Sequence, residues 1–335
     1  IRLSLVGSEM CIRDSSGCVY LVGAGPGEAK LITLRGYELL EQADVVVYDY
    51  LAAEDLLRWT PVGAERIYVG KQAGDHTLRQ EEIITLLIDK AKQGKSVVRL
   101  KGGDPTIFGR GGEEAVALAE AGIAFEIVPG VTAASAAGAY AGIPLTHRDC
   151  ASEVAFITGH EDEHRIGKSQ VDWELLGRWR GTLVFYMGVK NVAVICEQLR
   201  RFGKAADTPA AIVRWAGTPR QKTLTATLDT LSRRVAEENI MPPALVFVGE
   251  VVRFREKLGW YERRPLFGKT IVVTRARAQV SELTERLELL GAEVLEFPAI
   301  RIKPPANPEP LRHAVDDIGN YAVSYTHLRA HETKA

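Results

Sequence analysis

The stretch CVYLVGAGPGEAKLITLRGYELLEQADVVVYDYL, residues 18–51, decides the fold. A short apolar strand at 19–23 runs into a glycine-rich loop, a helical pattern follows, and a second apolar strand is predicted at 44–48. Strands that alternate with helices in this way are typical of a mostly parallel sheet covered by helices. The sequence therefore predicts an α/β fold.

The same alternation continues along the chain. Strands are predicted at 66–69, 96–100 and 125–128, with a helix at 78–92 and a small-residue helix at 131–142. A second α/β block follows, with a helix near 192–202 and predicted strands at 153–158, 182–187, 210–215, 222–228 and 244–248. No helix separates the strands around 210–228, so we expect an antiparallel component there.

A third α/β beginning is predicted after Pro265. It reads as a strand at 270–274, a helix at 280–290 and a strand at 293–297, and then stops in a Pro-rich stretch. Because roughly 60 residues are too few to complete an α/β layer, we expect a truncated domain over 265–322. Residues 1–17 and 324–335 look foreign to the rest of the chain, and we expect them to be non-native tails.

Composition narrows the class of protein. The 335 residues are 46% hydrophobic and 25% charged, ordinary values for a chain that buries a core. The formal net charge of −1 provides no basic field for nucleic acid or for an anionic membrane. The uncharged stretch 127–146 lacks the large apolar residues of a membrane span. The four cysteines form no C-x-x-C pair, so we expect reduced thiols in a cytoplasmic protein, with no metal site.

Candidate ligand-binding residues follow the predicted strands of the first block, where open parallel sheets bind ligands. Three familiar motifs are excluded. Glu28 stands where a dinucleotide fingerprint needs its third glycine, and no GK[ST] has the upstream glycine of a phosphate-binding loop. The H-E-x-x-H match at 160–164 directly follows a strand, so we interpret it as a charged loop and not as a zinc helix. The loops instead suit a small, partly apolar, cationic ligand. The sequence after each strand is GAGPGE (23–28), Asp49, Gly70-Lys71, KGGDP (101–105) and PGVTA (129–133).

Several long motifs carry a family resemblance. GAGPGEAKLITLRGYELLEQADVVVYDYL (23–51), VRLKGGDPTIFGRGGEE (98–114) and PGVTAASAAGAYAGIPLTHR (129–148) closely resemble uroporphyrinogen-III C-methyltransferases. The later TLVFYMG (182–188), IVRWAGT (212–218) and PPALVFVGEVV (242–252) fit the same family, so the resemblance covers about 18–260. Residues 265–322 resemble the opening portion of uroporphyrinogen-III synthase.

The resemblance implies a tetrapyrrole-methyltransferase fold. Its two α/β domains, expected at 18–148 and 149–260, would enclose the active site in a cleft, and the enzyme would be a cytoplasmic homodimer. The implied reaction transfers two methyl groups from S-adenosylmethionine to uroporphyrinogen III, releasing S-adenosylhomocysteine. Its product, precorrin-2, serves sirohaem and cobalamin synthesis. A synthase activity is not expected from the short C-terminal segment.

The resemblance also assigns roles to residues. Asp49 matches the proposed proton acceptor and Lys71 the proposed proton donor, although Lys71 could equally bind a substrate carboxylate. Glu28 departs from the more usual aspartate of the family, for which we expect a modest loosening of the loop. Cations near the motifs, expected to meet the eight substrate carboxylates, are Arg35, Arg99, Lys101 and Arg110, followed by Arg148, Lys190 and Arg214. The S-adenosylmethionine contacts fall on Pro26, Gly102, Gly103, Asp104, Ile107, Thr132, Ala133, Met187, Ala216 and Gly217.

Three alternatives stay open on the sequence. The nearest is a methyltransferase of the same fold that acts on a later corrin precursor, a protein side chain or ribosomal RNA. A nicotinamide-dependent oxidoreductase is disfavoured by the broken dinucleotide fingerprint. A non-catalytic S-adenosylmethionine sensor is disfavoured, weakly, by the presence of both Asp49 and Lys71.

Overall fold

The computed structural model describes residues 17–51, 54–70, 78–160, 171–274, 281–299 and 307–320. The chain divides into two compact units, which are treated separately. The first comprises the residues up to Lys269 together with Leu290–Glu293, and the second comprises Thr270–Leu289 and the residues from Val294 onward. Within the described ranges, no helix has both the length and the apolar character needed to cross a bilayer.

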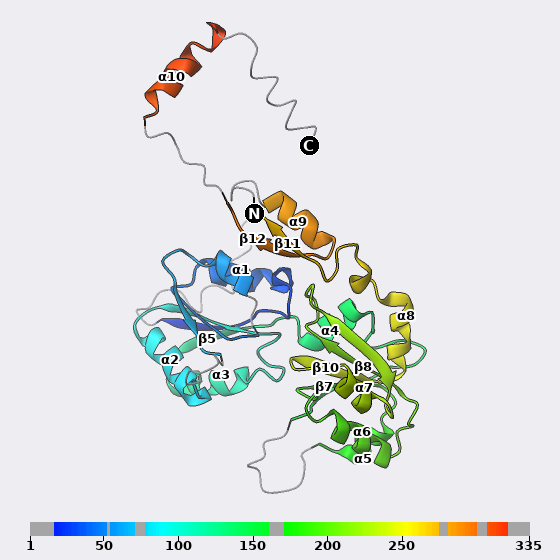
Figure 1. The fold of residues 1–335 in the computed structure, drawn as a ribbon. Helices are drawn as coiled ribbons and strands as arrows, with labels where there is room; N and C mark the ends of the chain where they lie inside the picture. The colour runs from blue at the N-terminus through cyan, green and yellow to red at the C-terminus, as the bar shows by residue number, and fades with distance from the viewer. Residues whose placement is uncertain are drawn as a thin grey trace. The chain divides into compact units, whose positions relative to one another are not determined.

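The first sheet is entirely parallel, as the alternation of strands and helices predicts. Its strand order is β3-β2-β4-β1-β5 (Figure 1), so β1 and β4 lie at the centre. The helices cover both of its faces, with α2 and α3 on one and α1 on the other. The strands are β1 (Cys18–Gly23), β2 (Val45–Tyr48), β3 (Glu65–Tyr68), β4 (Ser96–Lys101) and β5 (Ala124–Val128). The helices are α1 (Leu34–Glu41), α2 (Gln80–Lys92) and α3 (Gly111–Glu120).

The second sheet is mixed, with the order β6-β7-β10-β8-β9. Only β6 and β7 pair in parallel, and β8 and β9 are antiparallel, which confirms the prediction for 210–228. Its strands are β6 (Val154–Thr158), β7 (Thr182–Tyr186), β8 (Pro209–Arg214), β9 (Lys222–Thr227) and β10 (Ala244–Val248). Helices α5 (Trp173–Arg178), α6 (Val192–Arg201) and α7 (Leu231–Glu237) belong to the same block, and α8 (Arg255–Leu258) follows it.

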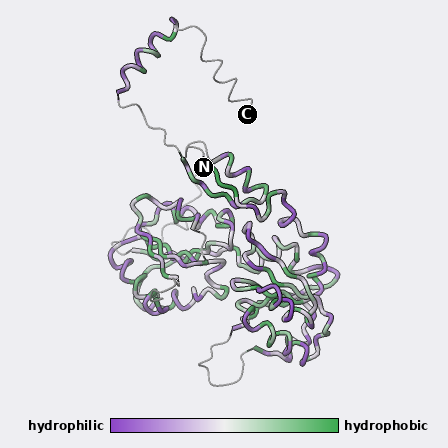
Figure 2. The backbone as a smooth tube through the Cα atoms, viewed as in Figure 1, coloured by the Kyte–Doolittle hydropathy of each residue, from purple (hydrophilic) through white to green (hydrophobic). Residues whose placement is uncertain are grey.

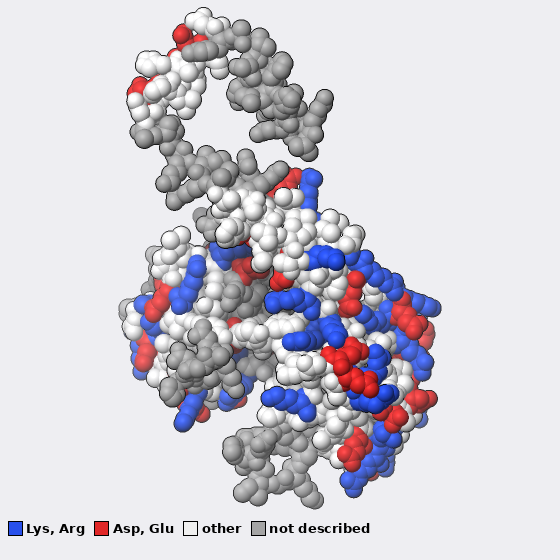
Figure 3. All heavy atoms as spheres, in the orientation of Figure 1, with Lys and Arg blue, Asp and Glu red and all other residues white. Residues whose placement is uncertain are grey.

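Apolar residues concentrate in these strands. Figure 2 shows the hydrophobic segments gathered along both sheets, and Phe185 and Phe247 of the second sheet are fully buried. Acidic and basic side chains are interspersed over the visible surface (Figure 3), in keeping with a net charge near zero. A mixed surface of this kind agrees with the exclusion of a dominant basic field.

Helix α4 (Ala133–Ala141) lies before the domain boundary expected at 148, yet it packs against the second sheet. It directly follows β5 of the first sheet, yet its buried alanines 134, 137 and 141 pack in one cluster with Val184, Phe247 and other residues of the second sheet. Small side chains allow this close approach, and Gly142 ends the helix in the left-handed conformation that glycine adopts without strain. The expected boundary at 148 groups α4 with the first sheet along the chain, whereas the buried face of α4 packs against the second.

The second unit contains β11 (Thr270–Val273), α9 (Ser281–Leu289) and β12 (Glu293–Glu296), and the two strands pair. All three lie within a residue or two of their predicted positions. The Pro-rich stretch differs from expectation, because helix α10 (Glu309–Asp316) forms there with Pro308 at its N-cap and Pro310 in its first turn. Proline is tolerated in the first helical turn, where an amide would have no helical partner.

Candidate active site

Four glycine-rich or polar segments leave the same edge of the first sheet. They are Gly23–Glu28 after β1, Asp49–Leu51 after β2, Gly102–Asp104 after β4 and Pro129–Ala133 after β5. All the strands are parallel, so their carboxyl ends meet at one edge, the place where open sheets bind ligands. The structure therefore collects these predicted segments as the sequence analysis expects. The segment after β3 continues into residues 71–77, so Lys71 lies outside the described residues.

Backbone contacts hold three of these segments together. The Gly103 amide donates a hydrogen bond to the Gly25 carbonyl at 2.9 Å, and the Gly25 amide donates to the Gly103 carbonyl at 3.2 Å. A Cβ on Gly130 would lie 2.3 Å from the Gly103 carbonyl oxygen, and a Cβ on Gly23 would lie 2.5 Å from the Gly130 backbone. No side chain fits at that distance, so glycine is needed for the loops to meet.

Asp104 ties two of these loops to each other. One carboxylate oxygen accepts hydrogen bonds from the Thr106 amide at 2.7 Å and hydroxyl at 2.5 Å, and the other accepts from the Gly130 amide at 3.0 Å. Burial by itself would raise the pKa of Asp104, but the hydrogen bonds from Thr106 and Gly130 outweigh it and lower the pKa below its ordinary value. Asp104 therefore places an ionised, hydrogen-bonded carboxylate at this edge.

Tyr186, at the end of β7, connects the second sheet to the loop after β5. Its buried hydroxyl lies 2.6 Å from Thr132 Oγ1 and accepts a hydrogen bond from the Ala134 amide at 3.0 Å. The Phe108 ring lies 4.8 Å from the Tyr186 ring. Ile107, Ala133 and Ala216 pack against the same apolar cluster as Tyr186. The sequence analysis missed Tyr186, although its position just before Met187 at a strand end is a usable signal.

A loop of the second sheet contacts the first glycine-rich loop. A Cβ on Gly27 would lie 2.4 Å from the Ala216 carbonyl oxygen, and one on Gly217 would lie 3.5 Å from the Pro26 carbonyl oxygen. The Gly217 amide donates to Gln221 Oε1 at 3.0 Å, which fixes this loop from behind. Pro26, Ala216 and Gly217, predicted from segments far apart in sequence, are therefore neighbours.

Three bulky residues near this region have left-handed backbones. Phe108, Met187 and Trp215 have φ angles of +52°, +56° and +50°, which are uncommon for residues other than glycine. Met187 is 53% exposed and Phe108 is 41% exposed, so both leave apolar surface uncovered. Strained backbones of this kind gather at ligand sites. Phe108 and Trp215 carry no sequence signal that identifies them.

Glu28, which stands where the family more usually has aspartate, accepts a hydrogen bond from a residue of α4. The Tyr140 hydroxyl of α4 donates a hydrogen bond to Glu28 Oε2 at 2.6 Å. Burial, and then this hydrogen bond, raise the pKa of Tyr140 well above its ordinary value. Since Glu28 reaches a specific partner, the contact argues against the loosening expected from its extra methylene.

Asp49 follows β2 and is 27% exposed at its side chain. Its Oδ1 accepts a hydrogen bond from the Leu51 amide at 3.1 Å, and its Oδ2 lies 3.0 Å from Nη2 of Arg99. Leu51 touches the Gly102 backbone closely, since a Cβ on Gly102 would lie 2.6 Å from Leu51 Cβ. The Tyr50 ring lies 5.9 Å from the Trp215 ring. Asp49 therefore lies beside the glycine pair, accessible to a ligand.

Four of the cations predicted to bind substrate carboxylates already have carboxylate partners within the protein. They are Arg35, Arg99, Lys101 and Arg110. Arg99 and Lys101 are each only 3% exposed and lie next to the buried Glu114, so they face the interior and not a ligand. The geometry does not support substrate contacts for these two. Arg35 binds Glu126 through two nitrogens at 2.9 and 2.7 Å, and Arg110 binds Glu113 at 2.6 Å.

The remaining predicted cations are Arg148, Lys190 and Arg214. Among the described residues these three make no ion pair with a carboxylate. Arg148 and Lys190 are exposed and Arg214 is partly exposed, although its Nε is buried without a hydrogen-bond partner in the described part of the chain. These three residues are therefore more open to solvent than Arg99 or Lys101.

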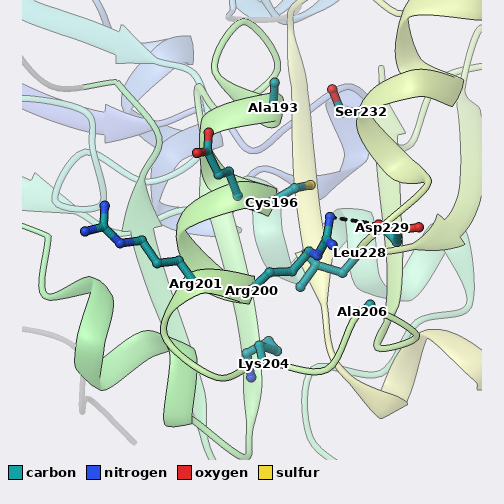
Figure 4. Close-up of a pocket in the computed structure, with 10 residues that line it drawn as sticks. Ala193, Cys196, Arg200, Arg201, Lys204, Ala206, Leu228, Asp229 and Ser232 are labelled. Carbon is teal, nitrogen blue, oxygen red and sulfur yellow. Dashed lines mark ion pairs between the residues drawn. The ribbon is translucent and has the colours of Figure 1, made fainter.

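A large cavity lies apart from these segments. This hollow of about 630 Å³ lies between α6 and α7, on the face of the second sheet that α4 does not cover. Arg200 and Asp229 form an ion pair at 2.7 Å in its wall (Figure 4). None of the predicted site residues lines it. The H-E-x-x-H match lies outside the described residues beyond His160, and the described residues hold no cluster of three metal-ligating side chains.

The chain belongs to the tetrapyrrole (corrin/porphyrin) methylase family, whose model matches residues 18–232. The α/β tetrapyrrole methylase fold expected from the sequence is thus confirmed. A solved structure from Thermus thermophilus, described as uroporphyrin-III C-methyl transferase complexed with S-adenyl homocysteine, has a TM-score of 0.60 at 43% identity. The match covers 71% of this chain and 99% of the other.

Two curated relatives are also similar. The siroheme synthase of Chromobacterium violaceum is 54% identical over 250 residues, which are 75% of this chain and 53% of the relative. The uroporphyrinogen-III C-methyltransferase of Bacillus subtilis is 45% identical over 317 residues, which are 94% of this chain and 64% of the relative. The chain therefore spans between about half and two thirds of these relatives' lengths.

Proposed function

We propose that the chain is an S-adenosylmethionine-dependent uroporphyrinogen-III C-methyltransferase that transfers two methyl groups and yields precorrin-2. The observation that carries this proposal is a junction between two groups of residues. The glycine-rich loops after β1, β4 and β5 meet there with Tyr186, Met187 and Ala216 of the second sheet. In the Thermus thermophilus protein, a relative of the same fold, S-adenosylhomocysteine is bound. We place the active site in a cleft at this junction.

The residues at the junction fit the proposed cofactor. Gly102 and Gly130 let the loops approach one another closely, and a Cβ on Gly103 would make only ordinary contacts, the nearest at 3.6 Å. The carboxylate of Asp104 suits a cationic ligand, and the exposed Met187 side chain suits the apolar part of a nucleoside. We assign the cofactor contacts to Pro26, Gly102, Gly103, Asp104, Ile107, Thr132, Ala133, Met187, Ala216 and Gly217. When bound, S-adenosylmethionine supplies an electrophilic methyl group.

We assign the proton chemistry to Asp49. Its carboxylate is partly exposed and held by the Leu51 amide and by Arg99, so its oxygens keep a fixed direction. A carboxylate in that position can accept the N–H proton of a pyrrole, which makes the pyrrole carbon a better nucleophile. Fixed geometry matters because methyl transfer depends chiefly on alignment of the reacting atoms. We propose Lys71 as proton donor or carboxylate ligand.

Substrate carboxylates need exposed cations. Arg148, Lys190 and Arg214 are the candidates that the structure leaves without carboxylate partners in its described ranges. Arg35 and Arg110 remain candidates if the substrate displaces Glu126 or Glu113, since both pairs are partly exposed. Exposed ion pairs are weak, roughly 0–1 kcal/mol, so such an exchange is energetically accessible.

Incubation of the purified chain with labelled S-adenosylmethionine and uroporphyrinogen III tests the proposal. We expect label in the macrocycle and a product mass that corresponds to two added methyl groups. If the protein binds S-adenosylhomocysteine but the macrocycle carries no label after incubation, uroporphyrinogen III is not the substrate. The assignment of the fold would not be affected. Parallel incubations with later corrin precursors separate the proposal from the nearest alternative.

Replacement of Asp104 by alanine is expected to weaken S-adenosylhomocysteine binding by roughly tenfold or more, because a charged hydrogen-bond acceptor is lost. The Gly130 and Thr106 amides would also lose their partner. Titration calorimetry measures the affinity, with the exposed Asp89 of α2 replaced by alanine as control. Equal affinities for wild type and Asp104→Ala would remove Asp104 from the site.

We further propose that residues 265–322 are the opening portion of a uroporphyrinogen-III synthase. The alignment with the Bacillus subtilis relative covers 94% of the chain and so extends into this segment. In the second unit, Val272, Leu295 and Phe297 are 50–70% exposed, a state that further strands or helices of an α/β domain would change.

From this assignment we expect no synthase activity. The two paired strands and two helices described between 270 and 316 do not make a complete α/β core. Purified chain mixed with hydroxymethylbilane should therefore yield only the isomer that forms spontaneously, as read by chromatography of the oxidised products. Enzymatic accumulation of the type III isomer would show that the segment is sufficient.

We also propose a cytoplasmic homodimer. In the described part of the chain, Cys150 and Cys196 are free thiols, in keeping with a reducing compartment. Edge strand β5 offers the partly exposed apolar side chains of Phe125 and Ile127, at 36% and 38% exposure, as surface for a second copy. Light scattering of the purified chain reports the mass in solution.

A further inference from the structure

Two cations and a carboxylate are buried together behind Asp49. Arg99 and Lys101 lie two residues apart on β4 and therefore point to the same face of the first sheet. Their side chains are 4% exposed, and Glu114 of α3, which meets them there, is completely buried. Charged side chains are almost never fully buried unless paired, so this group requires an explanation.

Glu114 holds the group together. Its Oε1 accepts hydrogen bonds from Lys101 Nζ at 2.8 Å and from Gln80 Nε2 of α2 at 2.9 Å. The same oxygen lies 3.5 Å from Arg99 Nε, which makes no hydrogen bond with the described residues. Glu114 therefore acts on the Arg99 guanidinium through charge and not through a hydrogen bond.

The same guanidinium of Arg99 also meets the proposed proton acceptor, Asp49. Nη2 lies 3.0 Å from Asp49 Oδ2, while Nη1 donates to the Leu100 carbonyl at 3.0 Å. The carbonyl contact helps to fix the guanidinium plane, so Asp49 and Glu114 both lie beside one buried cation. A change of charge at Glu114 must therefore be felt at Asp49, since a buried site screens charges weakly.

The charged groups that face Asp49 can be counted on each described element. Strand β4 contributes Arg99 and Lys101, and α3 contributes Glu114. At the start of α3, Arg110 and Glu113 are exposed and neutralise each other in an ion pair. Helix α2 contributes only the neutral Gln80 to the contacts of Glu114. With Asp49 ionised, Arg99, Lys101 and Glu114 leave no net charge on the group.

We propose that Glu114 is a positioning residue for the methyl-transfer reaction and that it maintains the basicity of Asp49 by offsetting the charge of Arg99 and Lys101. This inference rests on the proposed function. Glu114 is completely buried, so it has no access to substrate or cofactor. Without its charge, two cations would hold Asp49 as a weaker base. Burial and then Arg99 already lower the pKa of Lys101, whereas Glu114 raises it, which shows the same opposition of charges.

The test is a charge-balance series of three variants: Glu114→Gln, Lys101→Met and the double variant. Glu114→Gln keeps the size and the acceptor oxygen and removes the charge. We expect the acid limb of its kcat profile to move to lower pH by about one unit or more. Its plateau kcat should fall by roughly tenfold, because a weaker base accepts the proton less readily. The KM for uroporphyrinogen III should change little.

The double variant removes one positive and one negative charge. We expect its acid limb to return toward the wild-type position, although two buried interactions have been lost. The exposed Glu120 on the same helix, replaced by glutamine, is the matched control and should leave the limb in place. Carbon-13 NMR of the Asp49 carboxyl group, in protein without ligands, should show the same movement of its titration midpoint and does not depend on activity.

The outcomes separate this inference from the function on which it rests. Wild-type protein that does not methylate uroporphyrinogen III refutes the proposed function, and the NMR midpoints still decide whether Glu114 influences Asp49. The positioning role is overturned if the wild type is active but Glu114→Gln changes neither measurement. These are the acid limb of the kcat profile and the NMR titration midpoint of Asp49. A double variant in which the limb moves further from wild type also overturns it, since it would mean that packing and not charge is responsible.

Discussion

Asp49→Asn is expected to lower kcat for methylation by roughly 10²–10⁴-fold, the range that a positioned general base contributes. Asparagine preserves the shape of the side chain, and its amide oxygen can still accept the hydrogen bond from the Leu51 amide. It cannot take up a proton at neutral pH. The loss should therefore appear in kcat, while the affinity for S-adenosylhomocysteine remains near that of the wild type.

Initial rates with labelled S-adenosylmethionine measure the effect, and calorimetry measures the affinity. Asp55→Asn is the control, because Asp55 is an exposed acid a few residues away and carries the same change in charge. If Asp49→Asn lowers the affinity for S-adenosylhomocysteine as strongly as it lowers kcat, the residue supports the loops and does not perform the proton chemistry. A rate equal to that of Asp55→Asn would exclude it from both tasks.

Gly130→Ala should nearly abolish cofactor binding. The added methyl group would lie 2.3 Å from the Gly103 carbonyl oxygen and 2.8 Å from Gly23 Cα, and all of these neighbours are backbone. Backbone cannot rotate away as a side chain can, so the loops after β1, β4 and β5 must separate. We expect a loss of stability of about 1–3 kcal/mol, typical of overpacking, and a larger loss in affinity.

Gly112→Ala provides the matched control, because a Cβ at Gly112 meets nothing within 4 Å. It lies in the first turn of α3, where alanine should leave stability unchanged or raise it by up to about 1 kcal/mol. Urea unfolding gives the stability and calorimetry with S-adenosylhomocysteine gives the affinity. Gly130→Ala protein that binds as tightly as Gly112→Ala would show that the contact of the three loops is not needed at the cofactor site.

Most of the fold could be predicted from the sequence because its signals are local. Strands such as β1 and β10 are runs of Val, Leu and other apolar residues bounded by glycine or proline, and their predicted ends lie within a residue of the observed ends. The antiparallel pair β8 and β9 followed from the lack of an intervening helix. Short helices such as α5 and α7 were not assigned in detail, since six or seven residues show little periodicity.

The partners of α4 could not be predicted in the same way. Its sequence of alanines and glycine indicates close packing but not the surface against which it packs. The chain connection to β5 favours the first sheet, whereas the buried alanines contact the second. Which surface accepts a small-residue helix depends on the shape of that surface, and no local pattern encodes it.

The candidate site shows a similar division. The glycine-rich loops were identified because ligand sites in parallel sheets have a fixed location. The roles of Arg99 and Lys101 could not be identified from the sequence. A basic residue beside a motif looks the same in the sequence whether it faces a ligand or a buried Glu114. Burial of charge depends on a partner from α3, and only the folded structure shows that partner.

The packing of α4 against the second sheet has a consequence for how this protein unfolds. The core of the second sheet includes α4, which follows the last strand of the first sheet along the chain. Neither sheet of the first unit can then melt alone without uncovering the alanine surface, so heating should unfold the two sheets in one cooperative transition. A fragment that begins after residue 148 would lack α4 and with it part of the core of the second sheet.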